Sequence, residues 1–356
     1  MTLSGRFFLP GPVEVHPDVM AAMQRPMIGH RTSTGFELAA RVQAGMQQVF
    51  QTRRPVMLAT GSATAMMEAA IRSGVRERLL AVVGGTFGER FAMIAERCGK
   101  EVVRLHVPRG SPLEPALLAA CLDGPPVDAV TLVHSETSTG VLEPVAELLP
   151  LLRKLSDAVT IVDAVTSIGG IDVPIDDWNA DFVVAGSQKA LGLPPGLCFG
   201  VASERFLERA RTVVERGFYL DVVAIYDSTI ASHFPQTPAL PVVNALECQL
   251  ARIAAEGLEA RWARHRAMRE RIEQWVESHG RCTIVAPSGR RSDTVTAFRL
   301  RDGLSANAIA TELAALGWQV AVGLDHDTDR MIRIGHMGDL LPEQLDPLFD
   351  VLLPRL

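Results

Sequence analysis

The sequence predicts an α/β protein, with a large domain built on a mainly parallel sheet covered by helices and a smaller α+β domain at the C-terminus. Short apolar runs rich in β-branched residues alternate with helical patterns over the first two thirds of the chain, which is typical of parallel strands buried on both faces. Near residue 244 the pattern changes to a long helical stretch that reaches about residue 278. The 356 residues, 47% of them apolar, suffice for two domains, or for one large domain with an appendage.

The predicted strands of the large domain are apolar runs that each end at small or polar residues. They cover residues 56–59, 79–83, 101–105, 129–133, 159–162 and 182–184. Helical patterns follow the first two runs, over 63–73 and up to about residue 98. Ligands of parallel sheets bind at the carboxyl ends of the strands, so the residues just after each run are the candidates for function.

The smaller domain is predicted from four further apolar runs, at residues 282–285, 294–300, 320–322 and 332–334. A helix near 306–316 and a final helix accompany them. The boundary is expected near residue 255, inside or beside the long helix. The large domain then spans 21–255 and the smaller domain 256–356.

Composition and charge exclude several classes of partner. The net charge is −6, whereas a general nucleic-acid binder needs a basic face. No stretch approaches the roughly 18 apolar residues of a membrane span, and residues 1–12 contain no secretory apolar region. The five cysteines are scattered and form no CxxC pair, as expected of reduced intracellular thiols. We therefore expect a cytoplasmic protein with no nucleic-acid or membrane partner.

Lys189 follows the apolar run 182–184 and is the first candidate for chemistry. A lysine among small residues at a strand end can form a Schiff base if burial or a neighbouring cation lowers the pKa of its amine. The alternative is a solvated loop lysine. The chain contains only two other lysines, Lys100 in a polar turn and Lys154 on a charged helix face, and Lys189 alone has an apolar, glycine-rich setting.

Three more segments follow predicted strands. Asp163 closes an apolar run, and a buried carboxylate there would suit a protonated pyridine nitrogen, although it could also cap the next helix. Residues 60–64 open a helix with small residues, which favours a phosphate or an ordinary N-cap. Phe87 lies among glycines and could stack on a flat ring or fill the core. Together with Lys189, these parts describe a site for pyridoxal phosphate.

At this point the chain resembles the class V, fold type I aminotransferases, in particular the alanine–glyoxylate and serine–pyruvate aminotransferase family. The resemblance covers essentially the whole chain. Besides the four segments above, it rests on residues 10–12, 27–31, 134–140 and 332–338, with the Ser-Gln-Lys-Ala segment 187–190 as the most specific signature. It implies the fold type I architecture, in which the large domain has a mainly parallel sheet of the seven-stranded type, with residues 1–20 as an N-terminal arm that packs on the active site and the smaller domain.

The resemblance implies a role for each cofactor-binding residue. Lys189 would form the Schiff base with the cofactor aldehyde and then move the proton between Cα and the cofactor. Asp163 would hold the pyridinium nitrogen, and Phe87 and Val165 would lie on opposite faces of the ring. The other implied cofactor contacts are Ser62, Ala63, Thr64, Gln188 and Thr137, with Thr237 reaching the phosphate of the neighbouring subunit in a homodimer with shared active sites.

For the substrates, the resemblance implies Arg333 as the clamp for the α-carboxylate, with Gly11 and Gly29 bringing backbone close to the amino acid. The predicted reaction moves the amino group of alanine or serine to glyoxylate or pyruvate. A lyase, a desulfurase, an epimerase or a non-catalytic protein of the same fold are the alternatives. Phe234 stands where relatives often carry a tyrosine, which leaves one expected cross-subunit contact in doubt.

Some conspicuous residues receive no catalytic role. No metal is expected, because the adjacent residues Asp325, His326 and Asp327 are more typical of a solvated loop than of a chelating site. Cys282 lies inside an apolar run and is interpreted as inert core and not as a desulfurase nucleophile. The histidines at positions 30, 134 and 336 are left without a role.

Overall fold

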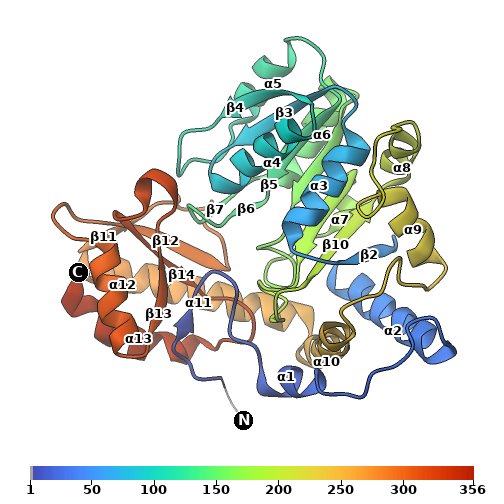
Figure 1. Cartoon of the computed structure of the whole chain (residues 1–356). Coiled ribbons are helices and arrows are strands. Elements are labelled where there is room, and N and C mark those ends of the chain that lie inside the picture. The colour runs from blue at the N-terminus through green and yellow to red at the C-terminus, as the bar shows by residue number, and fades with distance from the viewer. Residues whose placement is uncertain (1–2) are drawn as a thin grey trace.

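The computed structural model describes residues 3–356 and is built around a seven-stranded sheet (Figure 1). The strands, in order across the sheet, are β2 (Val56–Thr60), β10 (Leu197–Ala202), β9 (Phe182–Gly186), β8 (Val159–Asp163), β5 (Ala129–Val133), β3 (Arg78–Val83) and β4 (Glu101–His106). Strand β10 runs antiparallel to both of its neighbours, β2 and β9, and the other neighbouring pairs of this sheet are parallel. The six runs predicted from the sequence all form strands here. The seventh strand, β10, was not predicted, because Cys198 and Gly200 interrupt its β-branched pattern.

Both faces of this sheet are buried, as expected for parallel strands. In β2, Val56 and Leu58 pack into one apolar core, while Met57 and Ala59 pack into the core on the opposite face. The first core is covered by α1 (Pro17–Ala22), α2 (Ser33–Val49), α5 (Pro115–Leu122), α6 (Val145–Leu155), α7 (Ile175–Trp178) and α10 (Leu240–Glu256). The second is covered by α3 (Ala63–Gly74), α4 (Thr86–Arg97), α8 (Glu204–Arg211) and α9 (Val222–Ile230).

A second sheet of five strands has its own apolar core. Its strands, in order, are β1 (Phe7–Phe8), β13 (Gln319–Val322), β14 (Met331–Gly335), β12 (Val295–Leu300) and β11 (Cys282–Ile284). The helices α11 (Leu258–His279), α12 (Ala306–Ala315) and α13 (Leu345–Leu352) pack on it. The N-terminal strand β1 joins this sheet beside β13, so the start of the chain lies beside its last third (Figure 1).

The long helix expected over 244–278 is in fact two helices. Helix α10 ends at Glu256, and α11 begins at Leu258, after Gly257 adopts a φ of +83°. A residue with positive φ cannot continue an α-helix, and glycine adopts such a backbone conformation at little cost. The break lies next to the predicted domain boundary, which itself stays a prediction.

The remaining elements are short. A two-stranded ribbon of β6 (Ser135–Glu136) and β7 (Val141–Leu142) follows β5, and three 3₁₀ turns are η1 (Asp325–Asp327), η2 (Pro342–Gln344) and η3 (Leu353–Arg355). Across residues 3–356, none of the helices combines the length and the apolar character needed to cross a membrane.

Candidate active site

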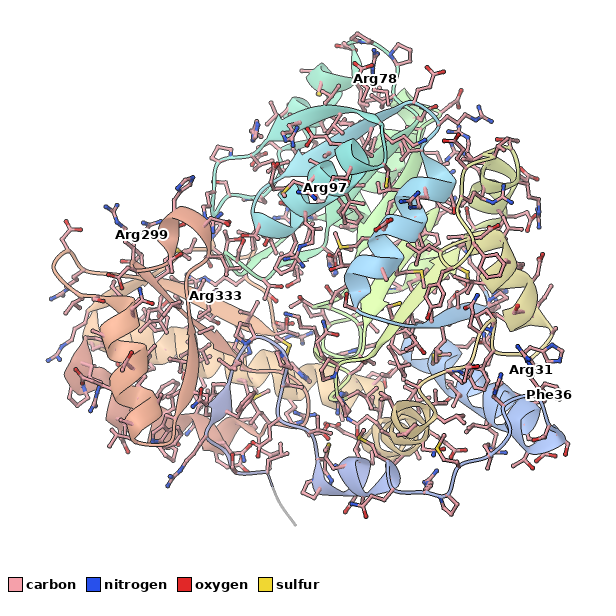
Figure 2. All side chains as sticks on the ribbon, in the orientation of Figure 1. Arg31, Phe36, Arg78, Arg97, Arg299 and Arg333 are labelled. Atoms are coloured by element: carbon pink, nitrogen blue, oxygen red, sulfur yellow. The ribbon has the colours of Figure 1, made fainter. Side chains whose placement is uncertain are left out.

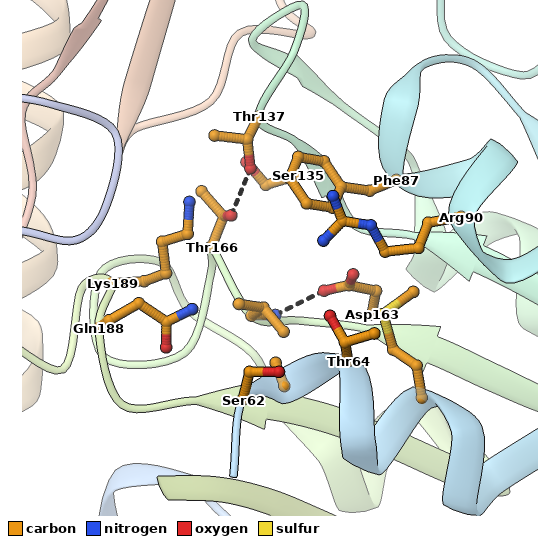
Figure 3. Close-up of a pocket in the computed structure, with 13 residues that line it drawn as sticks. Ser62, Thr64, Phe87, Arg90, Ser135, Thr137, Asp163, Thr166, Gln188 and Lys189 are labelled. Atoms are coloured by element: carbon orange, nitrogen blue, oxygen red, sulfur yellow. Dashed lines mark hydrogen bonds between the residues drawn. The ribbon is translucent and has the colours of Figure 1, made fainter. Parts of the chain in front are cut away.

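A cavity of about 140 Å³ lies at the carboxyl ends of the central strands. Its walls come from the segments that follow β2, β3, β5, β8 and β9, which is where ligands of parallel sheets bind (Figure 3). The lining residues are Ser62, Ala63, Thr64, Met67, Phe87, Arg90, Ser135, Thr137, Asp163, Val165, Thr166, Gln188 and Lys189. Nine of them were named from the sequence as cofactor-binding residues.

Lys189 lies just after β9 and is 7% exposed. Its Nζ donates a hydrogen bond to the backbone carbonyl of Pro10, from the segment that follows β1. Burial lowers the pKa of Lys189 to about 8, and the positive charge of Arg333 adds to the effect. The unprotonated, nucleophilic fraction of this amine near neutral pH is therefore much larger than that of an ordinary lysine.

Asp163 is the last residue of β8 and is 4% exposed. Its Oδ1 accepts a hydrogen bond of 2.8 Å from the backbone N–H of Val165. No cationic side chain of residues 3–356 lies within 4.0 Å of this carboxylate. Burial raises the pKa of Asp163 to about 6, and the neighbouring charge of Glu136 contributes in the same direction. A buried carboxylate without a counter-ion is costly, so the cavity is suited to a cationic group beside Asp163.

The start of helix α3 forms the floor of the cavity. Ser62 is the N-cap residue, yet its side chain makes no capping hydrogen bond. The first backbone N–H groups of a helix have no partner within it, so those near Ala63 and Thr64 are free to bind an anion. Opposite them, Gln188 has a buried side-chain oxygen with no hydrogen-bond partner among the described residues.

Phe87 lies in the first turn of α4, and its backbone N–H donates to the carboxylate of Glu136 over 3.1 Å. The guanidinium carbon of Arg90 sits 4.6 Å from the centre of the Phe87 ring, and Figure 3 shows it beside the cavity. On the other wall, the hydroxyls of Thr137 and Thr166 are 2.6 Å apart. Sequence reasoning missed Arg90, Glu136 and Thr166. Arg90 lies only three residues after Phe87, but of these two residues only Phe87 was assigned a role from the sequence.

Arg333 does not line this cavity, but it reaches the cavity wall from the smaller sheet (Figure 2). From β14 its Nε donates to the carbonyl of Val322 over 2.8 Å, and its Nη1 donates to the carbonyl of Thr137 over 3.2 Å. No carboxylate of the described chain pairs with it. Burial lowers the pKa of Arg333 to about 10. A buried cation without a counter-ion suits an anionic ligand.

The other three predicted residues lie at different distances from this centre. Gly11 has a φ of +100°, and a Cβ there would meet the Lys189 side chain at 2.5 Å, so the backbone approaches that lysine closely. Gly29 is exposed ahead of α2 and does not line the cavity of its own chain. Thr237 also lies outside it, in a small separate pocket shared with Tyr219 and Phe234.

The histidines that received no role are mostly packing residues. His134 is buried edge-on against Trp178, with ring centres 4.8 Å apart, and burial lowers its pKa to about 3. His336 is buried with its Nε2 at 2.9 Å from the hydroxyl of Thr296, and burial lowers its pKa to about 3 as well. Both rings are therefore neutral at physiological pH. Between residues 3 and 356, no cluster of His, Cys, Asp or Glu is arranged to hold a metal ion.

A larger groove of about 870 Å³ shares Thr64 and Arg90 with the cavity and runs along α4 to the loop around η1. This loop is attached to the opposite wall by polar contacts. Thr86 donates to Asp325 over 2.5 Å, and Arg109 pairs with Asp327 over 2.6 Å. We call these four residues the groove bridge. Asp325 and Asp327 thus contact the other wall of the groove and do not form a free loop.

Comparison with known proteins decides the family of this chain. Residues 88–332, well over half of the sequence, match the family model described as aminotransferase class-V. The chain belongs to the class-V aminotransferases. This aminotransferase is 36% identical to an uncharacterized aminotransferase of Methanocaldococcus jannaschii, over 93% of this chain and 87% of that protein. It is 31% identical to a serine–glyoxylate aminotransferase of Methylorubrum extorquens, over 94% and 86% of the two chains.

Solved structures show the same relationship. The alanine–glyoxylate aminotransferase of a Nostoc species superposes with a TM-score of 0.92 at 30% identity, covering 98% of this aminotransferase and 94% of that chain. The fold is therefore fold type I, as the resemblance predicted. Aminotransferases of this class use pyridoxal phosphate, which is the cofactor of this enzyme.

The residues around the cavity fit this cofactor. Asp163 is a buried carboxylate that lacks a cation, and Lys189 is a buried amine of lowered pKa. The uncapped start of α3 offers N–H groups to a phosphate. Each polar group that the cofactor would require is thus present and not engaged by an ionic partner within the described chain.

Proposed function

We propose that this aminotransferase transfers the amino group of a small amino acid, alanine or serine, to a 2-oxo acid such as glyoxylate or pyruvate. The observation that carries the proposal is the unpaired guanidinium of Arg333, buried beside the same cavity that holds Lys189. A planar guanidinium binds a carboxylate through two parallel hydrogen bonds and so fixes the orientation of an amino acid. The relatives named as alanine–glyoxylate and serine–glyoxylate aminotransferases support the choice of substrates.

The cofactor would be held by the residues named from the sequence. Asp163 would accept a hydrogen bond from the protonated ring nitrogen, and Phe87 and Val165 would lie against the ring. The phosphate would lie at the start of α3, near Ser62, Ala63, Thr64 and Gln188, with Thr137 beside the cofactor. When bound, pyridoxal phosphate supplies an electron-withdrawing ring that stabilises negative charge at the Cα of the amino acid.

The chain's own residues would do the rest. Arg333 would orient the amino acid by its α-carboxylate, with the backbone at Gly11 and Gly29 approaching the substrate. The amine of Lys189, whose pKa is lowered to about 8, would take the proton from Cα and pass it to the cofactor, and it would make the reverse transfer in the second half of the cycle. Because the amine and the proton it must move share one buried cavity, little water would compete for that proton.

We also propose a cytoplasmic homodimer in which Thr237 of the partner subunit reaches the phosphate. In support, Thr237 does not line the cavity of its own chain, and Phe218 exposes 88% of its surface near that region of the sequence. Light scattering of the purified enzyme should give twice the mass of one chain. A monomer with full activity would overturn the shared active site.

The substrate assignment is tested with a panel of donors against a panel of acceptors. Alanine and serine should give the highest kcat/KM, with glyoxylate or pyruvate as acceptor, and Lys189→Ala should abolish turnover. Borohydride treatment of the enzyme should attach the cofactor irreversibly to the peptide that contains Lys189, as seen by mass spectrometry. Attachment at another residue, or a clear preference for bulky donors, would contradict the proposal.

A further inference from the structure

Arg261 lies on α11, outside the cavity, and is a deeply buried charged residue with only 1% of its surface exposed. Its Nε donates to the carbonyl of Gly169 over 2.9 Å, and its Nη2 donates to the carbonyl of Ala190 over 2.9 Å. Its Nη1 donates to Glu256 over 2.7 Å and to Asp339 over 2.9 Å. One side chain thus binds four segments that are far apart in the sequence.

Two of these acceptors belong to the segments that carry the proposed catalytic residues. Ala190 directly follows Lys189, and Gly169 lies in the turn that follows Asp163 at the end of β8. Both acceptors are backbone carbonyls. A guanidinium that bridges them therefore fixes the distance between the loop of the lysine and the loop of the carboxylate.

The third acceptor, Asp339, connects Arg261 to the strand that carries Arg333. Asp339 lies in the loop that follows β14, and its carboxylate also accepts from Gln249 over 3.1 Å. Burial acts to raise the pKa of Asp339, but the charges of Arg261 and Arg252 and the hydrogen bonds from Arg261 and Gln249 together leave the pKa below its ordinary value. Asp339 is therefore ionised, and the bond from Arg261 is a charge-assisted one between two buried groups.

We propose that Arg261 is a positioning residue for the transamination, which holds the loops of Lys189, Asp163 and Arg333 in one arrangement. This rests on the roles given to those residues in the proposed function. The planar guanidinium carries five N–H donors spread over three nitrogens and so reaches all four acceptors, whereas a lysine ammonium has only three N–H donors on one nitrogen. A misplacement of the reacting groups by about 1 Å can slow a reaction by roughly a hundredfold, so loss of this link should slow chemistry more than binding.

Arg264 provides a matched control. It lies one turn further along α11 and also pairs with Glu256, over 2.6 Å. It donates to the carbonyls of Gly338 and Leu340, but it contacts neither Gly169 nor Ala190. Arg264→Gln therefore removes comparable contacts near the smaller sheet while leaving the loops of Lys189 and Asp163 tied to Arg261.

The test compares Arg261→Lys with Arg264→Gln at a temperature well below the unfolding midpoint of both. The first readout is the rate at which pyridoxal phosphate attaches to Lys189 in the cofactor-free protein, followed by its visible absorbance. The second is the rate of Cα proton exchange of alanine in heavy water. We expect Arg261→Lys to slow both by roughly tenfold or more, with the dissociation constant of alanine changed by less than about threefold. Arg264→Gln should stay within about twofold of the wild type in both.

If Arg261→Lys and Arg264→Gln slow both reactions equally, or if folded Arg261→Lys reacts at normal rates, the proposal is overturned. Attachment of the cofactor to Lys189 needs no amino acid substrate. A wild-type protein that attaches the cofactor but does not exchange the Cα proton of alanine would therefore contradict the substrate assignment. The attachment rates would still test the role of Arg261. If Arg261→Lys does not fold, Asp339→Asn serves instead, because it weakens one contact and keeps Arg261. Unchanged exchange in Asp339→Asn would then overturn the role of this link.

Discussion

At the scale of single residues, the site combines three buried groups whose charges affect one another. Lys189 has a lowered pKa, Asp163 has a raised pKa, and Arg333 has a lowered pKa, in each case chiefly because of burial. None of the three is neutralised by an ion pair within the described chain. Burying these groups without counter-ions is energetically unfavourable. A bound cofactor and amino acid would supply the missing opposite charges.

Arg333→Gln should change two measurable properties. Amino acid binding should weaken by roughly 2–5 kcal/mol, because one partner of a charged pair is lost. Since the positive charge of Arg333 helps to lower the pKa of Lys189, its removal should raise that pKa from about 8. The pH dependence of cofactor attachment should therefore shift to higher pH. Arg281→Gln, an exposed change near the same sheet, is the control. Unchanged affinity for amino acids in Arg333→Gln would place the carboxylate site elsewhere.

The lowered pKa of Lys189 also predicts how the stability of the cofactor-free protein depends on pH. The folded amine titrates near pH 8, and the unfolded amine titrates near 10.5. Between these values the unfolded chain binds more protons, so the contribution of this group to the free energy of unfolding rises with pH. Urea unfolding of the wild type and of Lys189→Met should show this rise in the wild type alone. Parallel pH curves would indicate that the pKa is not lowered.

At the scale of elements, the start of α3 should respond to charge in opposite ways with and without cofactor. Ser62→Asp places a carboxylate at an N-cap that now makes no capping bond, so it should stabilise the cofactor-free protein by roughly 0.5–1 kcal/mol. The same carboxylate should repel the phosphate and weaken pyridoxal phosphate binding severalfold. Ser62→Ala, which loses no capping bond, should leave the free energy of unfolding of the cofactor-free protein nearly unchanged. Tighter cofactor binding by Ser62→Asp would place the phosphate elsewhere.

The elements show what the sequence could and could not predict. The run 129–133 was predicted as a strand and is β5, because continuous burial leaves an unbroken apolar pattern. The position of Asp163 at the end of a strand could be predicted from the same kind of unbroken apolar pattern. The neighbours of β10 could not be predicted, since its antiparallel pairing with β2 joins segments over a hundred residues apart. Glu136 was missed likewise, because it acts on backbone N–H groups 49 residues earlier.

At the scale of the whole molecule, the groove bridge joins the loop between β13 and β14 to the wall formed by α4 and the segment after β4. Asp325 adopts a φ of +54°, which is unfavourable for a residue with a side chain, and it contacts Thr86 and Arg109 in that conformation. Such contacts between distant segments leave no periodic signal in a sequence. They could be found only from the folded chain.

The groove bridge should be measurable as a coupling between its members. In a double-mutant cycle with Arg109→Ala and Asp327→Ala, the coupling free energy should be roughly 1 kcal/mol, because both side chains are partly shielded from water. It should decrease as salt is added. The free energy of unfolding in urea gives the four values that the cycle needs. Coupling near zero at low salt would indicate that the contact does not hold the two walls together.

The burial of Lys189 in a chain with just three lysines has an analytical consequence. Lys154 is exposed, while Lys100 donates to the backbone of Arg76 at the surface. A protease that cuts after lysine divides the unfolded chain into residues 1–100, 101–154, 155–189 and 190–356. Any group covalently fixed on Lys189 blocks the last cut and leaves residues 155–356 as one peptide. The ratio of that peptide to its two fragments therefore reports, from a single digest, what fraction of the molecules carried a modified lysine.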